Sequence, residues 1–172
     1  MLSIFHLTTY AQQNLTVDCT AGPVSTTFCY DTGLDNSYTF ISNDGTPLNL
    51  TIDVGQVENN WDELVIRDSD GTELYNGYGN VGDISGLTFQ SSGDTIEFEV
   101  DEDGSISCVS SGYTPITFTV SCATCINPQV NYEVVSDCLN APQFFVDVDV
   151  IDLGSAGSLT LSDNQGNSSS VN

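Results

Sequence analysis

Basic residues are almost missing from this chain. Arg67 is the only Lys or Arg among 172 residues, against 24 Asp and Glu, which gives a formal net charge of −23 at pH 7. Because phosphate binding needs clustered Lys and Arg, this composition excludes nucleic acid as a partner. So much charge of one sign also repels itself when the chain folds. Two interpretations stay open: a solvated acidic surface suited to a salty medium, or such a surface with specific cation sites in addition.

The residues of common catalytic centres are also scarce. His6 is the only histidine and lies close to the N-terminus, so the serines and cysteines have no evident base to activate them. Paired carboxylates, which glycosidases use, are so frequent here that a pair carries almost no information. We therefore predict that the chain is not an enzyme.

Long hydrophobic runs are absent as well. No segment is apolar enough to span a bilayer, so we expect no insertion into a membrane. The first residues hold a short apolar run and a small residue, Ala11, before Gln12, which is typical of the second half of a secretory signal. We predict a residual signal peptide over residues 1–13, with an irregular N-terminal arm as the alternative. A secreted, extracellular or cell-surface location follows.

Six cysteines are present, an even number that is typical of disulfides in an oxidising compartment. Cys122 and Cys125 form a CxxC, but zinc is disfavoured because neither a second CxxC nor paired histidines accompany it. A thioredoxin-like role is disfavoured because no βαβ pattern surrounds it. The expected disulfides join cysteines that are neighbours in the sequence: Cys19 with Cys29, Cys108 with Cys122, and Cys125 with Cys138.

Apolar residues alternate with polar ones along the chain, and helical periodicity is missing. Turn-forming residues separate the alternating segments, for example Asp70-Gly71 and Asp103-Gly104. This pattern predicts an all-β protein with an antiparallel β-sandwich. The apolar sets expected to face the core are Leu15, Val17 and Cys19; Leu48, Leu50, Ile52 and Val54; Leu64 and Ile66; Ile96, Phe98 and Val100; and Ile116, Phe118 and Val120.

A domain boundary is predicted near residues 122–128. The first domain then covers residues 14–122, and a second alternating pattern starts at Val130 and continues through residues 144–150 and 159–161. Residues 125–172 are too few for a complete sandwich of about 100 residues. We therefore expect a truncated second β-sandwich over this range.

Several short segments of residues 14–122 follow one another in a characteristic order and spacing. These segments are Leu48–Ile52 followed by Glu58, Trp61–Asp68, Gly77–Gly79, Ser91–Asp94, Phe98–Asp101 and Gly112–Tyr113. In this order and spacing, residues 14–122 resemble a CUB domain of the kind found in bacterial secreted surface and adhesin proteins, which implies an antiparallel jelly-roll β-sandwich. Residues 125–172 resemble, more distantly, the beginning of an immunoglobulin or fibronectin repeat.

The resemblance also implies a calcium site. Many CUB domains bind calcium with an acid before an aromatic-Asp pair, with that Asp, and with two residues of a late loop. Calcium prefers six to eight hard oxygen ligands on loops that can bend, which suits these residues. The alternative is that they are ordinary solvated loop acids. Carried over to this chain, the ligands are Glu58, Asp62, Asp101 and Asp103.

Two aromatic residues near these acids, Trp61 and Tyr78, are candidate contacts for a ligand. The alternative for Trp61 is a partly buried position at the rim of the sandwich. Together, these observations predict a secreted, calcium-stabilised binding or adhesion module that recognises an extracellular protein or a polysaccharide. A structural spacer of a multidomain adhesin and an accessory domain of a secreted hydrolase are the competing hypotheses.

Overall fold

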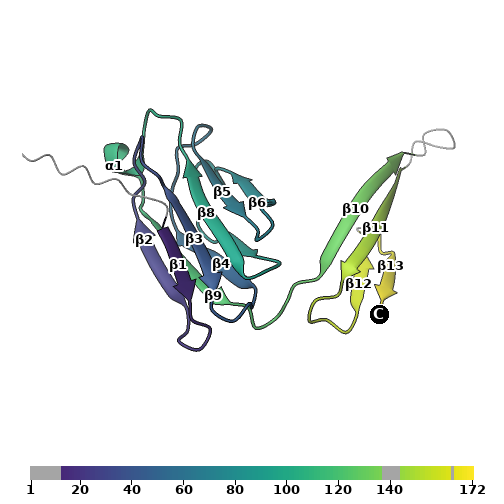
Figure 1. Cartoon of the computed structure of the whole chain (residues 1–172). Coiled ribbons are helices and arrows are strands. Elements are labelled where there is room, and N and C mark those ends of the chain that lie inside the picture. The colour runs from purple at the N-terminus through teal and green to yellow at the C-terminus, as the bar shows by residue number, and fades with distance from the viewer. Residues whose placement is uncertain (1–12, 137–143, 164) are drawn as a thin grey trace, which may run out of the picture. The chain divides into compact units, whose positions relative to one another are not determined.

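The computed structural model describes residues 13–136, 144–163 and 165–172 (Figure 1). The chain forms two compact units, which divide between Ala123 and Thr124. Nearly all regular structure is β-strand, so the all-β prediction is confirmed. The predicted signal peptide lies outside the described residues except for Gln13, the first residue of the first strand. Within the described residues, no helix is long and apolar enough to cross a bilayer.

Two β-sheets make up the first unit. The five-stranded sheet has the order β1-β3-β8-β5-β6, and the four-stranded sheet has the order β2-β9-β4-β7. A single turn of helix, α1 (Cys108–Ser111), precedes β9. The strands are β1 (Gln13–Val17), β2 (Val24–Phe28), β3 (Ser37–Ser42), β4 (Leu48–Val54), β5 (Glu63–Arg67), β6 (Glu73–Gly77), β7 (Thr88–Gln90), β8 (Thr95–Asp101) and β9 (Ile116–Cys122).

One strand pair departs from the antiparallel expectation. β1 pairs with β3 in parallel, whereas the other strand pairs of the first unit are antiparallel. The chain leaves β1, crosses into the four-stranded sheet as β2 and returns as β3, and parallel neighbours require such a crossover connection.

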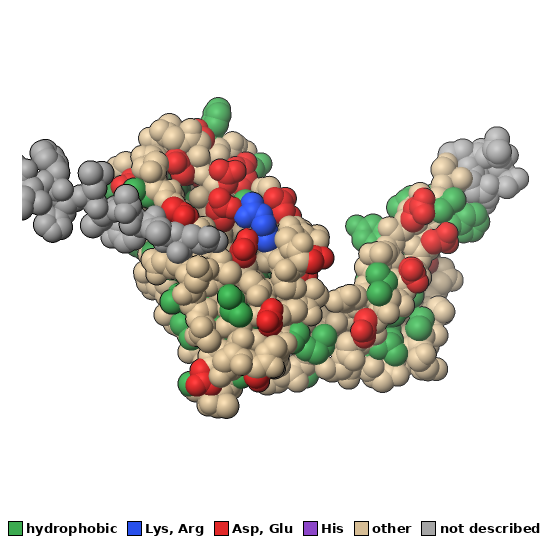
Figure 2. All heavy atoms as spheres, in the orientation of Figure 1, with side chains coloured by type: hydrophobic (Ala, Val, Ile, Leu, Met, Phe, Trp, Pro, Cys, Tyr) green, Lys and Arg blue, Asp and Glu red, His purple; other side chains and the backbone are tan. Residues whose placement is uncertain are grey.

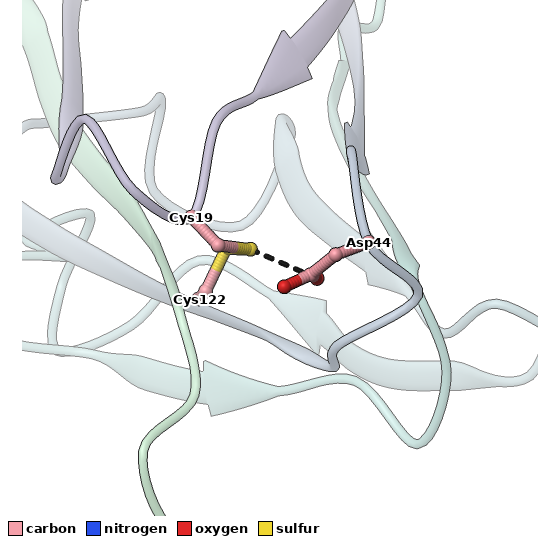
Figure 3. Close-up of side chains that lie close together, drawn as sticks. All are labelled: Cys19, Asp44 and Cys122. Atoms are coloured by element: carbon pink, nitrogen blue, oxygen red, sulfur yellow. Dashed lines mark hydrogen bonds between the residues drawn. A yellow bond between two sulfur atoms is a disulfide. The ribbon is translucent and has the colours of Figure 1, made fainter.

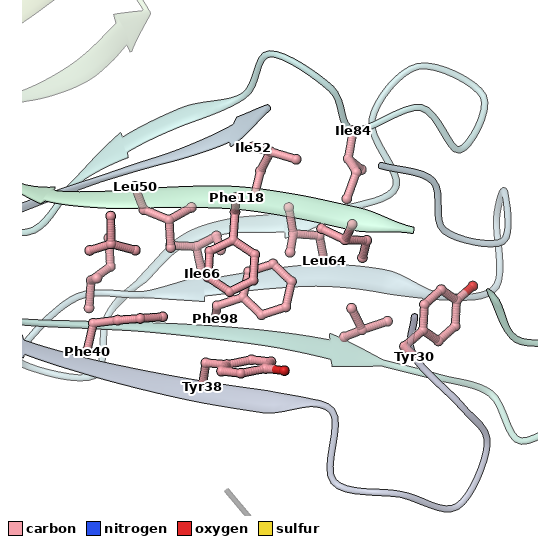
Figure 4. Close-up of a cluster of buried hydrophobic side chains, with 14 of the residues drawn as sticks. Tyr30, Tyr38, Phe40, Leu50, Ile52, Leu64, Ile66, Ile84, Phe98 and Phe118 are labelled. Carbon is pink, nitrogen blue, oxygen red and sulfur yellow. The ribbon is translucent and has the colours of Figure 1, made fainter. Parts of the chain in front are cut away.

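The core lies between the two sheets and is rich in aromatic rings (Figure 4). Phe98 of β8 stacks on Phe118 of β9 with ring centroids 4.5 Å apart, which joins the centre of one sheet to the centre of the other. The predicted inward residues of β4, β5, β8 and β9 are buried, with one exception. Val54 is 41% exposed because the β4–β9 register shifts between Ile52 and Val54. An irregularity of one residue reverses the face to which a side chain points.

The disulfides differ from the predicted pairs. Cys19 bonds Cys122 and Cys29 bonds Cys108, with Cα atoms 5.4 and 5.2 Å apart, so the predicted Cys19–Cys29 and Cys108–Cys122 pairs are wrong. The physical reason is that a strand separates the two cysteines of each predicted pair. β2 lies between Cys19 and Cys29, and β9 lies between Cys108 of α1 and Cys122. A seven-residue strand such as β9 spans about 23 Å at roughly 3.3 Å per residue, far more than the 4.4–6.8 Å between the Cα atoms of a disulfide. Cys138, the predicted partner of Cys125, lies outside the described residues.

The second unit consists of two hairpins, each a two-stranded antiparallel sheet. β10 (Gln129–Ser136) pairs with β11 (Phe144–Asp152). The predicted segment 159–161 is part of β12 (Leu159–Ser162), which pairs with β13 (Ser168–Val171) instead of extending the first hairpin. In the described part of this unit no residue is fully buried.

Candidate metal centre

A tight turn before β5 brings two of the predicted ligands together. The backbone N–H groups of Trp61 and Asp62 both donate to the carbonyl oxygen of Glu58, at 3.3 and 3.1 Å. Asn60 takes a left-handed conformation with φ of 67°, which closes the turn. Asp62 is in phase with the inward residues of β5, and its side chain is completely buried. Sequence alternation thus points this carboxylate into the end of the sandwich.

Hydrogen bonds hold the buried Asp62 carboxylate in place. Tyr30 donates its hydroxyl proton to Asp62 Oδ2 at 2.6 Å, and the backbone N–H of Asp103 donates to Asp62 Oδ1 at 3.0 Å. The same Tyr30 hydroxyl accepts the N–H of Glu58 at 3.1 Å. Burial and the hydrogen bond to Asp62 raise the pKa of Tyr30 above its ordinary range, so the phenol remains a donor. Tyr30, which the sequence analysis did not single out, therefore orients two candidate ligands.

The third acid comes from the loop after β8. Ser105 donates its backbone N–H and its hydroxyl to Asp103 Oδ1, at 2.9 and 2.7 Å. Glu102 accepts the N–H of Gly33 through Oε1 and that of Gly104 through Oε2. These bonds tie the acidic loop to itself and to the segment that follows Tyr30. Asp103 is thereby held beside Asp62.

Glu58, Asp62 and Asp103 form a cluster in which a side-chain oxygen atom of each lies within 4.8 Å of the others. We call these three acidic side chains the carboxylate group. The Oε2 atom of Glu58 is buried and has no hydrogen-bond partner among the described residues. Burial, and then the charges of Asp62 and Asp103, raise the pKa of Glu58. Burying a carboxylate oxygen without a donor is costly, and a cation at this point would remove that cost. The donor set of hard oxygens fits calcium, with the other ligands left to backbone carbonyls and water.

Asp101 does not belong to this group. It lies opposite Glu63 in the β5–β8 register, and it has the same phase as Glu97 and Glu99 on the outer face of the five-stranded sheet. Along β8 the inward positions are Ile96, Phe98 and Val100, so the next residue must point outward. Of the four acids predicted as ligands, the structure brings three together and leaves this one on another face.

The two predicted contact residues differ in exposure. Trp61 is 61% exposed and is next to the buried Asp62 in the sequence. Tyr78 is partly buried and packs against the hydrophobic core. Tyr113, a further ring of this end, has its pKa raised by burial and by the charges of Glu58 and Asp62. Of these three rings, Trp61 is therefore the most open to a ligand, and its backbone lies on the turn that carries Glu58 and Asp62.

A second cluster, formed by Cys19, Asp44 and Cys122, has the geometry of a metal site but not its chemistry (Figure 3). The two cysteines form a disulfide, and metals bind thiolates. Asp44 Oδ1 lies 3.1 Å from Cys19 Sγ. Since a bridged sulfur has no proton to donate, we interpret this approach as a polar contact beside the disulfide.

The single basic residue sits among acids on the outer face of the five-stranded sheet. Figure 2 shows the basic side chain bordered by acidic ones. Arg67 pairs with Glu99 on β8 and more distantly, at 3.8 Å, with Glu73 on β6. A shallow hollow of about 440 Å³ lies along this face, and Asp101 is among its lining residues. The positive charge of Arg67 thus offsets part of the repulsion among the acidic residues on this face of the sheet.

No protein-family profile matches the sequence, and no curated protein matches it. Among solved structures, the full extracellular region of zebrafish Gpr126/Adgrg6 has a TM-score of 0.51 and 16% identity, over 74% of this chain and 18% of that one. The MASP-1 CUB2 domain bound to Ca2+ has a TM-score of 0.48 and 15% identity, over 64% of this chain and 99% of that domain. The chain spans 18% of the length of the zebrafish region, and such low identity shows a shared fold alone.

Proposed function

We propose that this chain is a CUB-like extracellular binding module that calcium stabilises through Glu58, Asp62 and Asp103. The observation that carries the proposal is the buried Oε2 of Glu58, which has no hydrogen-bond donor in the described residues and faces two more carboxylates. Three clustered negative charges destabilise the folded chain unless a cation neutralises them. The two disulfides, and the similar fold found in an extracellular region of another protein, are consistent with an extracellular location.

The metal would act on the fold by joining separate segments. Glu58 and Asp62 lie on the turn that leads into β5, and Asp103 lies on the loop that leaves β8. A cation that binds all three crosslinks these neighbouring strands where the sheet ends. An ion that binds only the folded chain stabilises it by about 2.7 kcal/mol when its concentration is a hundred times Kd.

Ligand recognition is assigned to the surface around the same site. Trp61 lies on the turn that carries Glu58 and Asp62, and its indole is exposed; an exposed aromatic ring is a frequent energetic centre of a protein or sugar interface. We infer binding and not catalysis, because the described residues include no histidine and the clustered acids have the chemistry of metal ligands. The recognised partner would be an extracellular protein or a polysaccharide.

The calcium part of the proposal is tested by thermal unfolding with added calcium, using two matched variants. Asp103→Asn and Asp101→Asn each remove one charge from an exposed residue, two positions apart, but only Asp103 belongs to the carboxylate group. We expect Asp101→Asn to keep the calcium-dependent rise in Tm and Asp103→Asn to lose most of it, as should Glu58→Gln. Equal responses of the two Asp variants would contradict the site. So would a wild-type shift no larger than sodium produces at matched ionic strength.

The recognition part is tested on glycan and protein arrays. Trp61→Ala should reduce binding at least tenfold, whereas Ile41→Ala should leave it unchanged. Ile41 is 41% exposed and pairs with Thr95 at the start of β8, a full strand away from Asp103. Calcium-dependent stability without any array binding would instead favour the structural spacer.

A further inference from the structure

The tight turn from Asn80 to Asp83 carries a residue that its backbone does not suit. The N–H of Asp83 donates to the carbonyl of Asn80 at 3.1 Å, and the N–H of Asn80 donates to the carbonyl of Asp83 at 2.9 Å. Between them Val81 and Gly82 have φ of 55° and 89°, which makes this a type I′ turn. Such turns favour Asn, Asp or Gly at the first central position, because a β-branched side chain is crowded at positive φ. Val81 is therefore strained.

The fold gains little from the side chain of Val81. It is 73% exposed, so it contributes almost nothing to the core. The structural contact of the turn comes from Gly82 instead: the N–H of Val57 donates to its carbonyl at 3.0 Å, and a Cβ on Gly82 would lie 2.6 Å from the carbonyl oxygen of Val57. Strained residues that the core does not need cluster at sites of ligand contact. The strain thus points to a role for Val81 outside the fold.

The turn lies against the segment that carries the carboxylate group. Gly82 touches both Val57 and Asn59, which are the neighbours of Glu58 in the sequence. Trp61, the exposed indole of the proposed recognition site, follows two residues after Asn59. The strained turn therefore adds a second exposed apolar side chain to the end of the sandwich where the candidate calcium ligands lie.

The helical turn α1 adds a third. Val109 is 58% exposed, and its backbone N–H donates to the carbonyl of Tyr30 at 3.3 Å. The hydroxyl of Tyr30 in turn binds Asp62. Figure 4 shows Tyr30 and Ile84, the residue after the strained turn, at the same end of the core. Three separate segments thus present exposed apolar side chains around one site, and we call them the apolar triad: Trp61, Val81 and Val109.

We propose that the module binds a protein through the apolar triad, and that Val81 is a specificity-determining contact. This inference rests on the proposed function, since it names the class of partner for the same site. Burying a sugar hydroxyl is costly unless it finds a hydrogen-bond partner, and valine methyl groups offer none. They do match the apolar centre of a protein interface. The two valines therefore favour a protein over a polysaccharide.

Charge and rigidity narrow the partner further. A chain with a net charge of −23 attracts basic proteins and repels acidic ones. The expected partner is an extracellular protein whose apolar contact is surrounded by Lys and Arg. Valine has few rotamers, and the two hydrogen bonds between Asn80 and Asp83 hold the turn that carries Val81. Little conformational entropy is lost when a partner covers such a side chain.

The test combines thermal unfolding with arrays of purified extracellular proteins and of polysaccharides, in the presence of calcium. The protein that gives the strongest signal is then titrated with each variant. Val81→Asn relieves the backbone, because Asn tolerates positive φ, and it removes the methyl groups without adding charge. We expect this variant to raise Tm by about 4 °C or more and to weaken binding to that protein at least fivefold. A residue that served the fold alone would not move the two quantities in opposite directions.

Two further variants separate the apolar contact from the strain. Val81→Thr keeps the branched shape and adds a hydroxyl, so it should weaken binding while Tm stays unchanged. Ile41→Asn makes the same exchange as Val81→Asn at an exposed β-branched residue far from the site, where φ is not positive. It should neither raise Tm nor weaken binding.

The proposal is overturned if the wild type binds polysaccharides only or nothing on either array. It is also overturned if both Val81 variants bind as tightly as the wild type, or if Val81→Asn fails to raise Tm. Trp61→Ala distinguishes this failure from that of the proposed function. Weaker binding by Trp61→Ala with full binding by the Val81 variants removes only the role of Val81, whereas full binding by all of them removes the recognition site itself.

Discussion

The two units share a sequence pattern but not a way of burying it. In the first unit the alternating residues of β8 face β9 of the other sheet, and Phe98 and Phe118 are fully buried. In the second unit β10 alternates just as regularly, yet all eight of its residues are exposed. Alternation therefore identifies a strand and its two faces. It does not show whether a second layer is present.

Disulfides give a large expected difference between the units. The Cys29–Cys108 disulfide lies inside the loop that Cys19–Cys122 closes, so this outer bond closes only 24 further residues in the unfolded chain, 10 from Cys19 to Cys29 and 14 from Cys108 to Cys122. A loop of this length is worth about 3.4 kcal/mol in the chain-entropy model, so replacing Cys19 and Cys122 with Ser should lower the unfolding free energy of the first unit by about 3–4 kcal/mol. Trp61, the only tryptophan, reports on this unit alone in denaturant titrations followed by fluorescence. Unchanged amide exchange in β10 and β11 is the control, and an unchanged fluorescence transition would contradict the prediction.

The same aromatic truncation in both units sharpens the comparison. Phe118 is fully buried, so Phe118→Ala should lower the free energy of unfolding by about 3–5 kcal/mol through the cavity it leaves. Phe145 on β11 is 55% exposed, and Phe145→Ala should change stability by less than about 0.5 kcal/mol. Chemical denaturation of both variants measures the difference. Similar losses for the two would show that the second unit is packed in solution.

The smallest effect concerns pH, and its sign differs between the units. The pKa of Glu58 is raised in the folded chain, so the stability linked to this group is present at low pH and is lost as pH rises through the folded pKa. With calcium removed by a chelator, Glu58→Gln should therefore be more stable than the wild type near neutral pH. The difference in stability between the two proteins should shrink as pH falls. Thermal unfolding across pH measures this difference.

Asp163 in the second unit should show the opposite dependence of stability on pH and serves as a control. Hydrogen bonds from Asn167 lower its pKa, so its contribution is present at neutral pH and is lost as pH falls. Asp163→Asn should lose protection of the β12 amides at neutral pH and differ little from the wild type in acid. A Glu58→Gln variant that is less stable than the wild type at pH 7 without calcium would show that Glu58 is not electrostatically strained.

Local sequence pattern predicted five of the nine strands of the first unit, β1, β4, β5, β8 and β9, because a buried strand face requires apolar residues at every second position. Leu48, Leu50 and Ile52 show this directly, and Val54 shows its limit, since a register shift is not visible in the alternation. The disulfides could not be predicted from neighbouring cysteines. Each pairing depends on which strand ends meet, and that follows from the crossover of β2 into the other sheet.

The candidate site was predicted in part. The resemblance indicated Glu58, Asp62 and Asp103, which the structure brings together, and Asp101, which it places on the outer face. The spacing of two between Asp101 and Asp103 suggested that both side chains point the same way. They do not, because the chain leaves β8 between them and the alternation ends. Tyr30 had no sequence signal, since a tyrosine 32 residues from Asp62 becomes its partner only through folding.

The sequence by itself determined the acidic charge, the β-class and the inward faces of the strands, because these depend on composition and on a periodicity of two residues. Only the tertiary structure decided the disulfide pairs, the membership of the carboxylate group and the buried oxygen of Glu58 that lacks a donor. These depend on how strands distant in sequence are ordered in two sheets, and local alternation is the same for many such orders.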